Sequence, residues 1–396
     1  MSEDHPYLVT ALVWASWTAI MLPRMVVTAL LPTLESTYHI THAQSGLLMT
    51  SYFYAYTLMQ IPAGILSDRF GGKRFIITSL AGSSIASLAL WRVESFGQMV
   101  LLRAVAGFFA GLWYAPSISL LTRSVRDRDR GKAMGIALSG PSVSDTMIFA
   151  MVGILGVDGF GWRNYFLIYA IPGFLCVLAT WFMIREVTEK QGLPDQSTGP
   201  RAQLEMLRNR VVLAILICAI AVSIAEYSLR TFLPTYYVQS RGLTSSEASL
   251  LMVSYAASIV LAKPLGGYLI DRLGYGLPST ITLATMYVVT LMLPVIPLGI
   301  PTVVVLLAWG LMGGWSVTVF SVLFTRLAPP HMRGTFLGIL NSCTFFGAAT
   351  GPLILGYVAD IGGFDTFFVS VLFVFILASV AAIPVLRSHW RVKGQT

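Results

Sequence analysis

The chain is a series of long apolar stretches separated by short loops, and the loops hold most of its charge. A helix that crosses a membrane needs about 20 predominantly apolar residues, and such stretches recur along the whole chain. Hydrophobic residues make up 56% of the 396 residues and charged residues only 11%, which excludes a water-facing fold. We therefore expect an all-α membrane protein. The 12 predicted transmembrane helices cover residues 8–31, 44–66, 74–93, 98–121, 132–157, 162–184, 211–235, 246–270, 278–297, 301–324, 334–357 and 364–386.

The placement of the basic residues predicts which helix ends face the cytoplasm. Of the 26 Lys and Arg residues, 19 fall in loops on one side and three, Arg92, Arg163 and Arg241, on the other. Cytoplasmic loops carry an excess of Lys and Arg, so both termini are predicted to lie inside. We expect a multi-pass protein of the plasma (inner) membrane, in contact with the lipid bilayer. The net charge of +8 is then explained by topology, and we expect no nucleic-acid partner.

The two halves of the sequence are related by a shift of 203 residues. The matches include Gly64, Asp68, Arg69 and Gly71, which recur as Gly267, Asp271, Arg272 and Gly274. Each half therefore holds six predicted helices, in an N-terminal bundle over residues 1–184 and a C-terminal bundle over residues 211–396. The polar segment 185–210 contains Gly and Pro and is predicted to be a cytoplasmic linker. Bundles in parallel repeat predict a substrate site at the midplane between them.

The segment between the second and third predicted helices carries a family signature. Residues 64–74 read Gly-Ile-Leu-Ser-Asp-Arg-Phe-Gly-Gly-Lys-Arg, which resembles the Gly-x-x-x-Asp-Arg-x-Gly-Arg-Arg motif of the major facilitator superfamily. The resemblance covers the whole chain and implies the major facilitator fold, with two pseudo-symmetric six-helix bundles and a cytoplasmic latch of charged contacts. The alternative is a plain charged turn that fixes topology. The expected latch residues are Gly64, Asp68, Arg69, Gly71, Arg74, Asp271 and Arg272.

A narrower resemblance begins at Arg24, which Pro32 follows at a spacing of eight residues. This spacing, and the sequence Tyr-Thr-Leu-Met-Gln-Ile-Pro-Ala-Gly over residues 56–64, resemble the anion:cation symporter family, which includes organic-anion and sugar-acid carriers. Members of that family often carry a carboxylate in the fourth helix. This chain lacks it, because residues 107–111 read Gly-Phe-Phe-Ala-Gly. The expected anion specificity therefore depends mainly on Arg24.

Five ionisable residues are predicted to lie well inside the membrane, namely Arg24, Arg103, Asp145, Glu226 and Arg230. A charge there costs roughly 2.5–3.5 kcal/mol on insertion scales, so each needs a partner or a wet cavity. At a shift of 202 residues Arg24 corresponds to Glu226, so opposite charges occupy equivalent places in the two halves. These residues are the first candidates for function.

We expect Arg24 to hold the anionic group of a substrate, because its rigid fork of donors suits a carboxylate. Glu226 is expected to face Arg24 across the substrate path and to carry a proton, since burial favours the neutral form of a carboxyl group. The alternative is a structural pair between Glu226 and Arg230, one helical turn further on.

Asp145 and Arg103 are further candidates for proton coupling. No basic residue lies within one helical turn of Asp145 in sequence, so it needs a proton or a partner on another helix. It is either a proton-coupling carboxylate or a polar packing group. Arg103 is structural, extends to the membrane surface or assists proton transfer. The expected coupling residues are Glu226, Asp145, Arg103 and Arg230.

Aromatic side chains near the predicted midplanes offer phenol and indole donors to a ligand. For any one of them, packing is the alternative interpretation. The expected substrate contacts are Arg24, Tyr52, Tyr56, Trp113, Tyr255 and Asn341.

These features predict a secondary transporter that imports a small organic anion, a carboxylate or sugar acid, by alternating access. The family resemblance implies that protons enter with the anion. The sequence has no Gly-x-x-x-x-Gly-Lys-Ser/Thr segment, so an ion gradient is the expected energy source. The three cysteines and five histidines do not cluster, and we expect no enzyme activity, cofactor or metal. The alternatives are a proton-coupled exporter of drugs or amphiphilic metabolites, which the 16 methionines favour, and a non-transporting sensor. A monomer suffices, because one chain holds both halves of the site.

Overall fold

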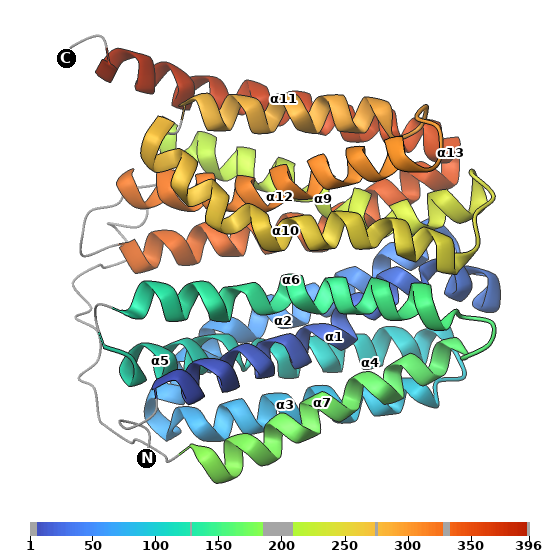
Figure 1. Cartoon of the computed structure of the whole chain (residues 1–396), viewed down its shortest axis with the longest axis vertical. Helices are drawn as coiled ribbons and strands as arrows, with labels where there is room; N and C mark the ends of the chain where they lie inside the picture. Colours follow the sequence, from blue (N-terminus) through green and yellow to red (C-terminus); the bar gives the residue numbers. More distant parts are fainter. Residues whose placement is uncertain (1–5, 127–128, 185–208, 274–275, 328–332, 394–396) are drawn as a thin grey trace.

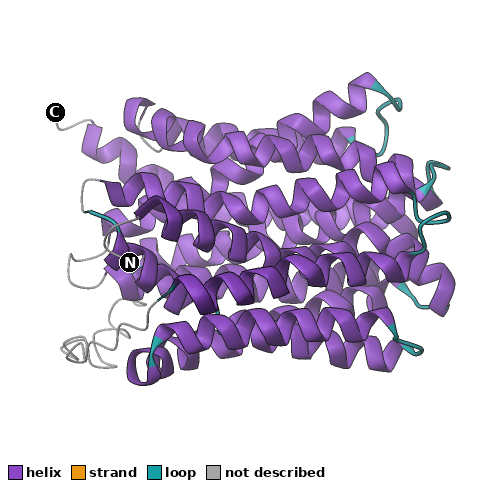
Figure 2. Cartoon of the chain, turned by 60° about the horizontal axis from the view of Figure 1, so that its bottom comes forward, coloured by secondary structure: helices purple, strands orange, loops and turns teal. Residues whose placement is uncertain are grey.

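The computed structural model describes residues 6–126, 129–184, 209–273, 276–327 and 333–393. Side chains are described in these ranges except at residues 6, 68, 263–271, 273, 276–280, 317–327, 333–337 and 384–393. The described residues form long helices that run alongside one another, with loops at the two ends and no strand (Figure 2). All but the last two residues of the predicted linker 185–210 lie outside this part of the chain.

The first half of the chain carries the helices up to α7. They are α1 (Pro6–Tyr38), α2 (His42–Phe70), α3 (Gly72–Trp91), α4 (Phe96–Gly111), α5 (Tyr114–Ser124), α6 (Arg130–Leu155) and α7 (Trp162–Met183). The predicted helix 98–121 is divided between α4 and α5. It breaks at Leu112 and Trp113 because Pro116 has no N–H to donate to the carbonyl of Leu112.

The second half carries the remaining helices. They are α9 (Arg210–Gln239), α10 (Ser245–Leu273), α11 (Gly276–Met292), α12 (Ile300–Leu327) and α13 (Arg333–Lys393). α13 covers two predicted helices and breaks between them at Gly363, whose φ is 69°. The predicted helix 278–297 is five residues too long, because Pro294 and Pro297 follow the end of α11. Eight described segments are long and apolar enough to cross a membrane, and shorter apolar stretches lie in α11 and α12.

The helices of the two halves form two groups that pack along a shared interface (Figure 1). Within the first half α2 packs on α4 and α1 on α6, and the equivalent pairs in the second half are α10 on α12 and α9 on α13. Between the halves α2 packs on α13, α6 on α10 and α1 on α9. The same pairs recur in both halves, as a parallel repeat requires. The helices that carry Arg24, Asp145 and Arg230 therefore all lie at the interface.

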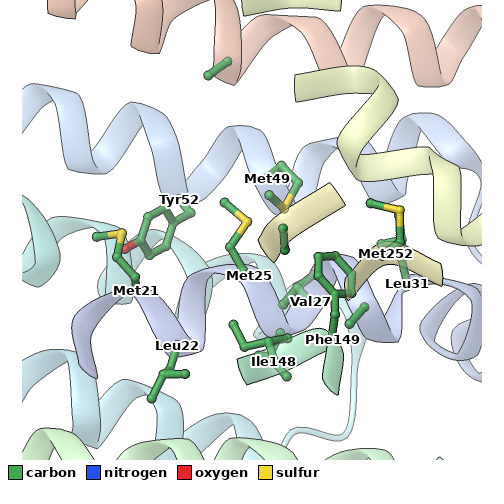
Figure 3. Close-up of a cluster of buried hydrophobic side chains, with 14 of the residues drawn as sticks. Met21, Leu22, Met25, Val27, Leu31, Met49, Tyr52, Ile148, Phe149 and Met252 are labelled. Carbon is green, nitrogen blue, oxygen red and sulfur yellow. The ribbon is translucent and has the colours of Figure 1, made fainter. Parts of the chain in front are cut away.

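The apolar core continues across the interface. Almost the whole of α1 is buried, since neighbours from both halves surround it. Figure 3 shows side chains of α1 meeting those of α2, α6 and α10, and Met252 of α10 belongs to the second half. Methionine is flexible and polarizable, so it fills irregular gaps between packed helices. The residues in this view include Met21, Met25, Met49, Tyr52, Phe149 and Met252.

Candidate functional site

Arg24 is a buried cation with few partners. It lies on α1 next to Pro23 and is only 6% exposed. One guanidinium nitrogen donates to Sδ of Met21 at 3.1 Å, and its Cζ lies 5.1 Å from the centre of the Phe53 ring. Its Nε has no hydrogen-bond partner among the described residues, and no described carboxylate lies within 4 Å. A thioether and an aromatic face leave most of this positive charge available to an anion.

Arg103 is held by backbone carbonyls and is fully buried. Its Nε donates to the carbonyl of Leu48 at 3.2 Å, and its terminal nitrogens donate to the carbonyls of Pro23 at 2.8 Å and Arg24 at 3.2 Å. Its Cζ also lies 4.6 Å from the centre of the Tyr52 ring. The side chain thus joins α4 to α1 and α2 and does not reach the membrane surface. These contacts favour a structural role for Arg103 over proton transfer. They also position the turn of α1 that carries Arg24.

We expect Arg103→Gln to lower the thermal stability of the detergent-solubilised protein more than Arg24→Gln does. Arg103 makes three charge-assisted bonds to backbone carbonyls, each worth about 1.5–3 kcal/mol, whereas Arg24 donates only to a thioether. Thermal unfolding of both variants beside the wild type measures the difference. An Arg103→Gln protein with wild-type stability but no proton-driven transport would instead support the proton-transfer alternative.

Asp145 of α6 and Arg230 of α9 form an ion pair across the interface between the halves. Both side chains are buried, at 4% and 7% exposure. The second carboxylate oxygen of Asp145 and Nε of Arg230 have no hydrogen-bond partner within the described part of the chain. Asp145 thus finds on another helix the partner that its own helix lacks. Because the pair is buried, removing the charge of either partner leaves the other as a buried, unpaired charge, which is costly.

Glu226 forms no ion pair with either arginine among the described residues. Neither Arg24 nor Arg230 is within 4 Å of its carboxylate in the described structure. Its Oε1 instead lies against α12, where a Cβ added to Gly313 would approach it to 2.9 Å. The alternative Glu226–Arg230 ion pair is thus not formed among the described residues, and the facing of Arg24 and Glu226 across a substrate path stays a prediction. The guanidinium of Arg230 is instead paired with Asp145, which approaches from the other half.

Among the other predicted substrate contacts, Tyr56 and Asn341 join the two halves. Tyr52 stacks on Tyr56 with ring centres 6.2 Å apart, and Tyr56 meets Phe345 of the second half at 5.1 Å. Tyr255 stacks on Trp309 at 4.0 Å. Three of the predicted contacts have a buried donor that lacks a hydrogen-bond partner within the described residues: Tyr52 Oη, Trp113 Nε1 and Tyr255 Oη. Asn341 donates to Gln60 at 3.4 Å and so joins α13 to α2. Buried donors without partners are sites where a ligand or water is expected to bind.

The cytoplasmic latch stays a prediction. The side chains of Asp68 and Asp271 lie outside the described residues. Arg69 is exposed, and Arg74 and Arg272 interact with neighbours. Gly71 ends α2 with a φ of 93°, and its N–H donates to the carbonyl of Ser67 at 3.0 Å. Glycine adopts this conformation at no steric cost, so the tight turn explains one glycine of the signature.

At the end of the bundle opposite the termini, four polar side chains join the halves. We call Glu35, His42, Gln239 and Asp360 the distal polar cluster. Asp360 of α13 accepts the N–H groups of His42 and Ala43 at 2.7 and 2.9 Å, at the start of α2. The carboxylate of Glu35 on α1 contacts Nδ1 of His42 at 3.0 Å and accepts a hydrogen bond from Nε2 of Gln239 at 2.9 Å. No described group of three His, Cys, Asp or Glu residues has the arrangement of a metal site.

We expect the contacts of the distal polar cluster to depend on pH, because His42 is one of its members. Burial opposes a charge on His42, but the hydrogen bond and charge of Glu35 and the charge of Asp360 outweigh burial and raise the pKa of His42 above 6.5. A raised pKa means that the stabilisation is fully present below the ordinary pKa and is lost as the pH rises through the raised value.

We therefore expect the distal end to open more often as the pH rises from below 6.5, the ordinary pKa of His42, through its raised value. Opening is measured as maleimide labelling of a Ser45→Cys variant in a cysteine-free background, since Ser45 is buried in the interface. Labelling of Ser240→Cys, an exposed position, corrects for the reagent's own pH dependence. His42→Gln should abolish the corrected pH dependence, and its persistence in that variant would contradict the role of His42.

A family model described as Major Facilitator Superfamily matches residues 8–245 and 215–393. The chain belongs to this superfamily. The resemblance predicted from residues 64–74 is thereby confirmed, and the protein is a membrane transporter and not an enzyme.

Individual relatives of this major facilitator are distant. It is 25% identical over 354 residues to the cis,cis-muconate transport protein of Acinetobacter baylyi (strain ATCC 33305 / BD413 / ADP1), over 86% of this chain and 84% of the relative. It is 26% identical over 353 residues to multidrug resistance protein MdtG of Rahnella sp. (strain Y9602), over 87% of this chain and 83% of the relative. A solved bacterial homolog of the human lysosomal transporter Spinster, inward-facing and unoccupied, matches 96% of both chains with a TM-score of 0.79 and 19% identity. That match establishes the fold.

Sequence reasoning missed the distal polar cluster of this major facilitator. Glu35, His42 and Asp360 fall at or beyond the predicted helix ends, where charges are expected to face water. A usable signal was present at the start of α2. Thr41 and Gln44 form a capping box there, which leaves the N–H groups of His42 and Ala43 in need of acceptors. The carboxylate of Asp360 supplies both acceptors.

Proposed function

We propose that this protein imports a small organic anion, a carboxylate or sugar acid, together with protons by alternating access of its two halves. The observation that carries this proposal is the buried guanidinium of Arg24, which has no carboxylate within 4 Å in the described residues. A buried charge without a counterion is costly, so it favours binding of an anion. The acid in the name of the Acinetobacter baylyi relative supports the same substrate class.

The proposed coupling element is the Asp145–Arg230 pair. It connects α6 of one half to α9 of the other, so any movement of the halves against each other strains or breaks it. A proton on Asp145 removes the charge that holds Arg230. Proton binding and movement of the halves are then linked through one contact, which is what symport requires. Glu226, which is also in the membrane and has no ion-pair partner among the described residues, is the second candidate.

The test is uptake of labelled acids into proteoliposomes, with and without an inward proton gradient. Benzoate and D-galactonate represent aromatic and polyhydroxylated acids. We expect the gradient to accelerate uptake and Arg24→Gln to reduce it about 100-fold, because two charge-assisted hydrogen bonds of about 1.5 kcal/mol each are lost. Arg92→Gln, at an exposed arginine, is the control. Uptake that survives Arg24→Gln would refute the proposal.

The second candidate function is export of drugs or amphiphilic metabolites by proton antiport. The methionines of the interface core favour it, because flexible side chains suit a pocket that accepts varied ligands. The name of the Rahnella relative points the same way. Arg24 disfavours a cationic drug. Opposite proton gradients separate the two functions. In proteoliposomes an antiporter accumulates a labelled dye when an outward proton gradient drives protons out. The symporter accumulates an acid when an inward proton gradient drives protons in.

A further inference from the structure

Arg24 and Arg230 contact the two rings of one aromatic pair that bridges the halves. Phe53 of α2 meets Tyr227 of α9 edge to face, with ring centres 5.4 Å apart. Cζ of Arg24 lies 5.1 Å from the centre of Phe53, and Cζ of Arg230 lies 5.9 Å from the centre of Tyr227. The structure thus places two guanidinium groups, one from each half, against the two rings of a single aromatic pair.

The two arginines differ in how their charge is balanced. Arg24 has no described carboxylate within 4 Å, whereas Arg230 has Asp145. Each has an Nε without a hydrogen-bond partner among the described residues, although each side chain is more than nine-tenths buried. A monocarboxylate on Arg24 leaves the Asp145–Arg230 pair intact. Once Asp145 takes a proton, Arg230 becomes a second buried cation in need of an anion.

We propose that the substrate is a dicarboxylate whose two carboxylates bind Arg24 and Arg230, with a proton on Asp145 releasing Arg230 for the second of them. This inference rests on the proposed anion transport and names its substrate class. The charges balance, because two carboxylates neutralise two arginines while Asp145 is neutral. Between the arginines the ligand passes the Phe53–Tyr227 pair, so its spacer is a short apolar or aromatic group. Binding a dianion thus takes up one proton, and binding a monoanion takes up none.

Other titratable groups around this pair need to be distinguished from Asp145. Arg230 is within electrostatic range of Tyr227 and Glu226 of its own helix and of Tyr255 of α10. α1 contributes Arg24, which carries no exchangeable proton in the physiological range. Glu226 is therefore the carboxyl that competes with Asp145 for the proton, and Glu226→Gln is the matched variant that separates them.

The test is direct binding of benzoate and terephthalate to the purified full-length protein by calorimetry between about pH 6 and pH 8. Both acids are fully ionised throughout this range, so any proton taken up goes to the protein. We expect the Kd of terephthalate to rise about tenfold per pH unit and that of benzoate to stay constant. In Asp145→Asn and in the double variant Asp145→Asn/Arg230→Gln the pH dependence should vanish. Terephthalate should bind tightly to Asp145→Asn. It should bind to the double variant no better than benzoate does.

The outcomes separate this inference from the proposed function. If the wild type binds neither acid, nor any other acid tested for uptake, anion transport itself fails. If it binds benzoate and terephthalate with similar, pH-independent Kd values, anion transport stands and the dicarboxylate inference is overturned. Loss of the pH dependence in Glu226→Gln but not in Asp145→Asn would also overturn it. The wild-type measurement decides the question even where a variant does not fold.

Discussion

The Asp145→Asn variant is expected to exchange substrate across the membrane at close to the wild-type rate but to lose accumulation driven by a proton gradient. Asparagine resembles the protonated aspartate in shape and charge, so Arg230 is released permanently. The carrier then runs its cycle without taking up a proton, and the gradient no longer drives it.

The expected effect on accumulation is large. A gradient of two pH units is worth about 2.7 kcal/mol per proton, which supports an accumulation ratio of about 100 in the wild type. The variant should reach a ratio near one. Proteoliposomes with an acidic exterior measure accumulation, and counterflow of labelled against unlabelled acid measures exchange.

A neighbouring substitution provides the control for this measurement. Ser144 is adjacent to Asp145 and buried, and its hydroxyl has no hydrogen-bond partner in the described part of the chain. Ser144→Ala should therefore keep full accumulation. If Asp145→Asn accumulates as well as the wild type, Asp145 is a packing group. Loss of accumulation in Glu226→Gln would then assign the proton to Glu226.

The Asp360→Ala variant is expected to open the distal end of the bundle and to slow net uptake. Asp360 is the one member of the distal polar cluster that accepts two backbone N–H groups, at the start of α2. A carboxylate at a helix N-terminus also interacts favourably with the helix dipole. Hydrogen bonds to a charged group are worth about 1.5–3 kcal/mol each, so the population of the open state should rise more than tenfold.

The rise is measured as the labelling rate of the Ser45→Cys probe by a membrane-impermeant maleimide. The charge distribution predicts that the distal end faces outside, so the reagent is added to intact cells. Asp365→Ala is the control, because Asp365 lies only five residues further along α13 and is exposed. Equal labelling of the Asp360→Ala and wild-type backgrounds would show that the contact does not hold the distal end closed.

Part of the candidate site was predictable from sequence because each intramembrane charge is visible as an exception in an apolar stretch. Arg24, Asp145 and Arg230 were identified in this way, and all three lie on helices at the interface between the halves. Their partners were not predictable. Helical spacing favoured Arg230 with Glu226, whereas the ion pair joins Arg230 to Asp145, 85 positions earlier in the chain.

The sequence alone determined the membrane class, the helix ends to within seven residues, the internal repeat and the superfamily. These properties depend on local hydropathy, on proline and glycine, and on short motifs, all of which are present in a single stretch of chain. The tertiary structure decided which polar groups meet. It directed Arg103 to backbone carbonyls, Arg230 to Asp145 and Asp360 to the start of α2. Such pairings depend on how helices from different halves pack, and buried polar groups take whichever partner the packing brings within reach.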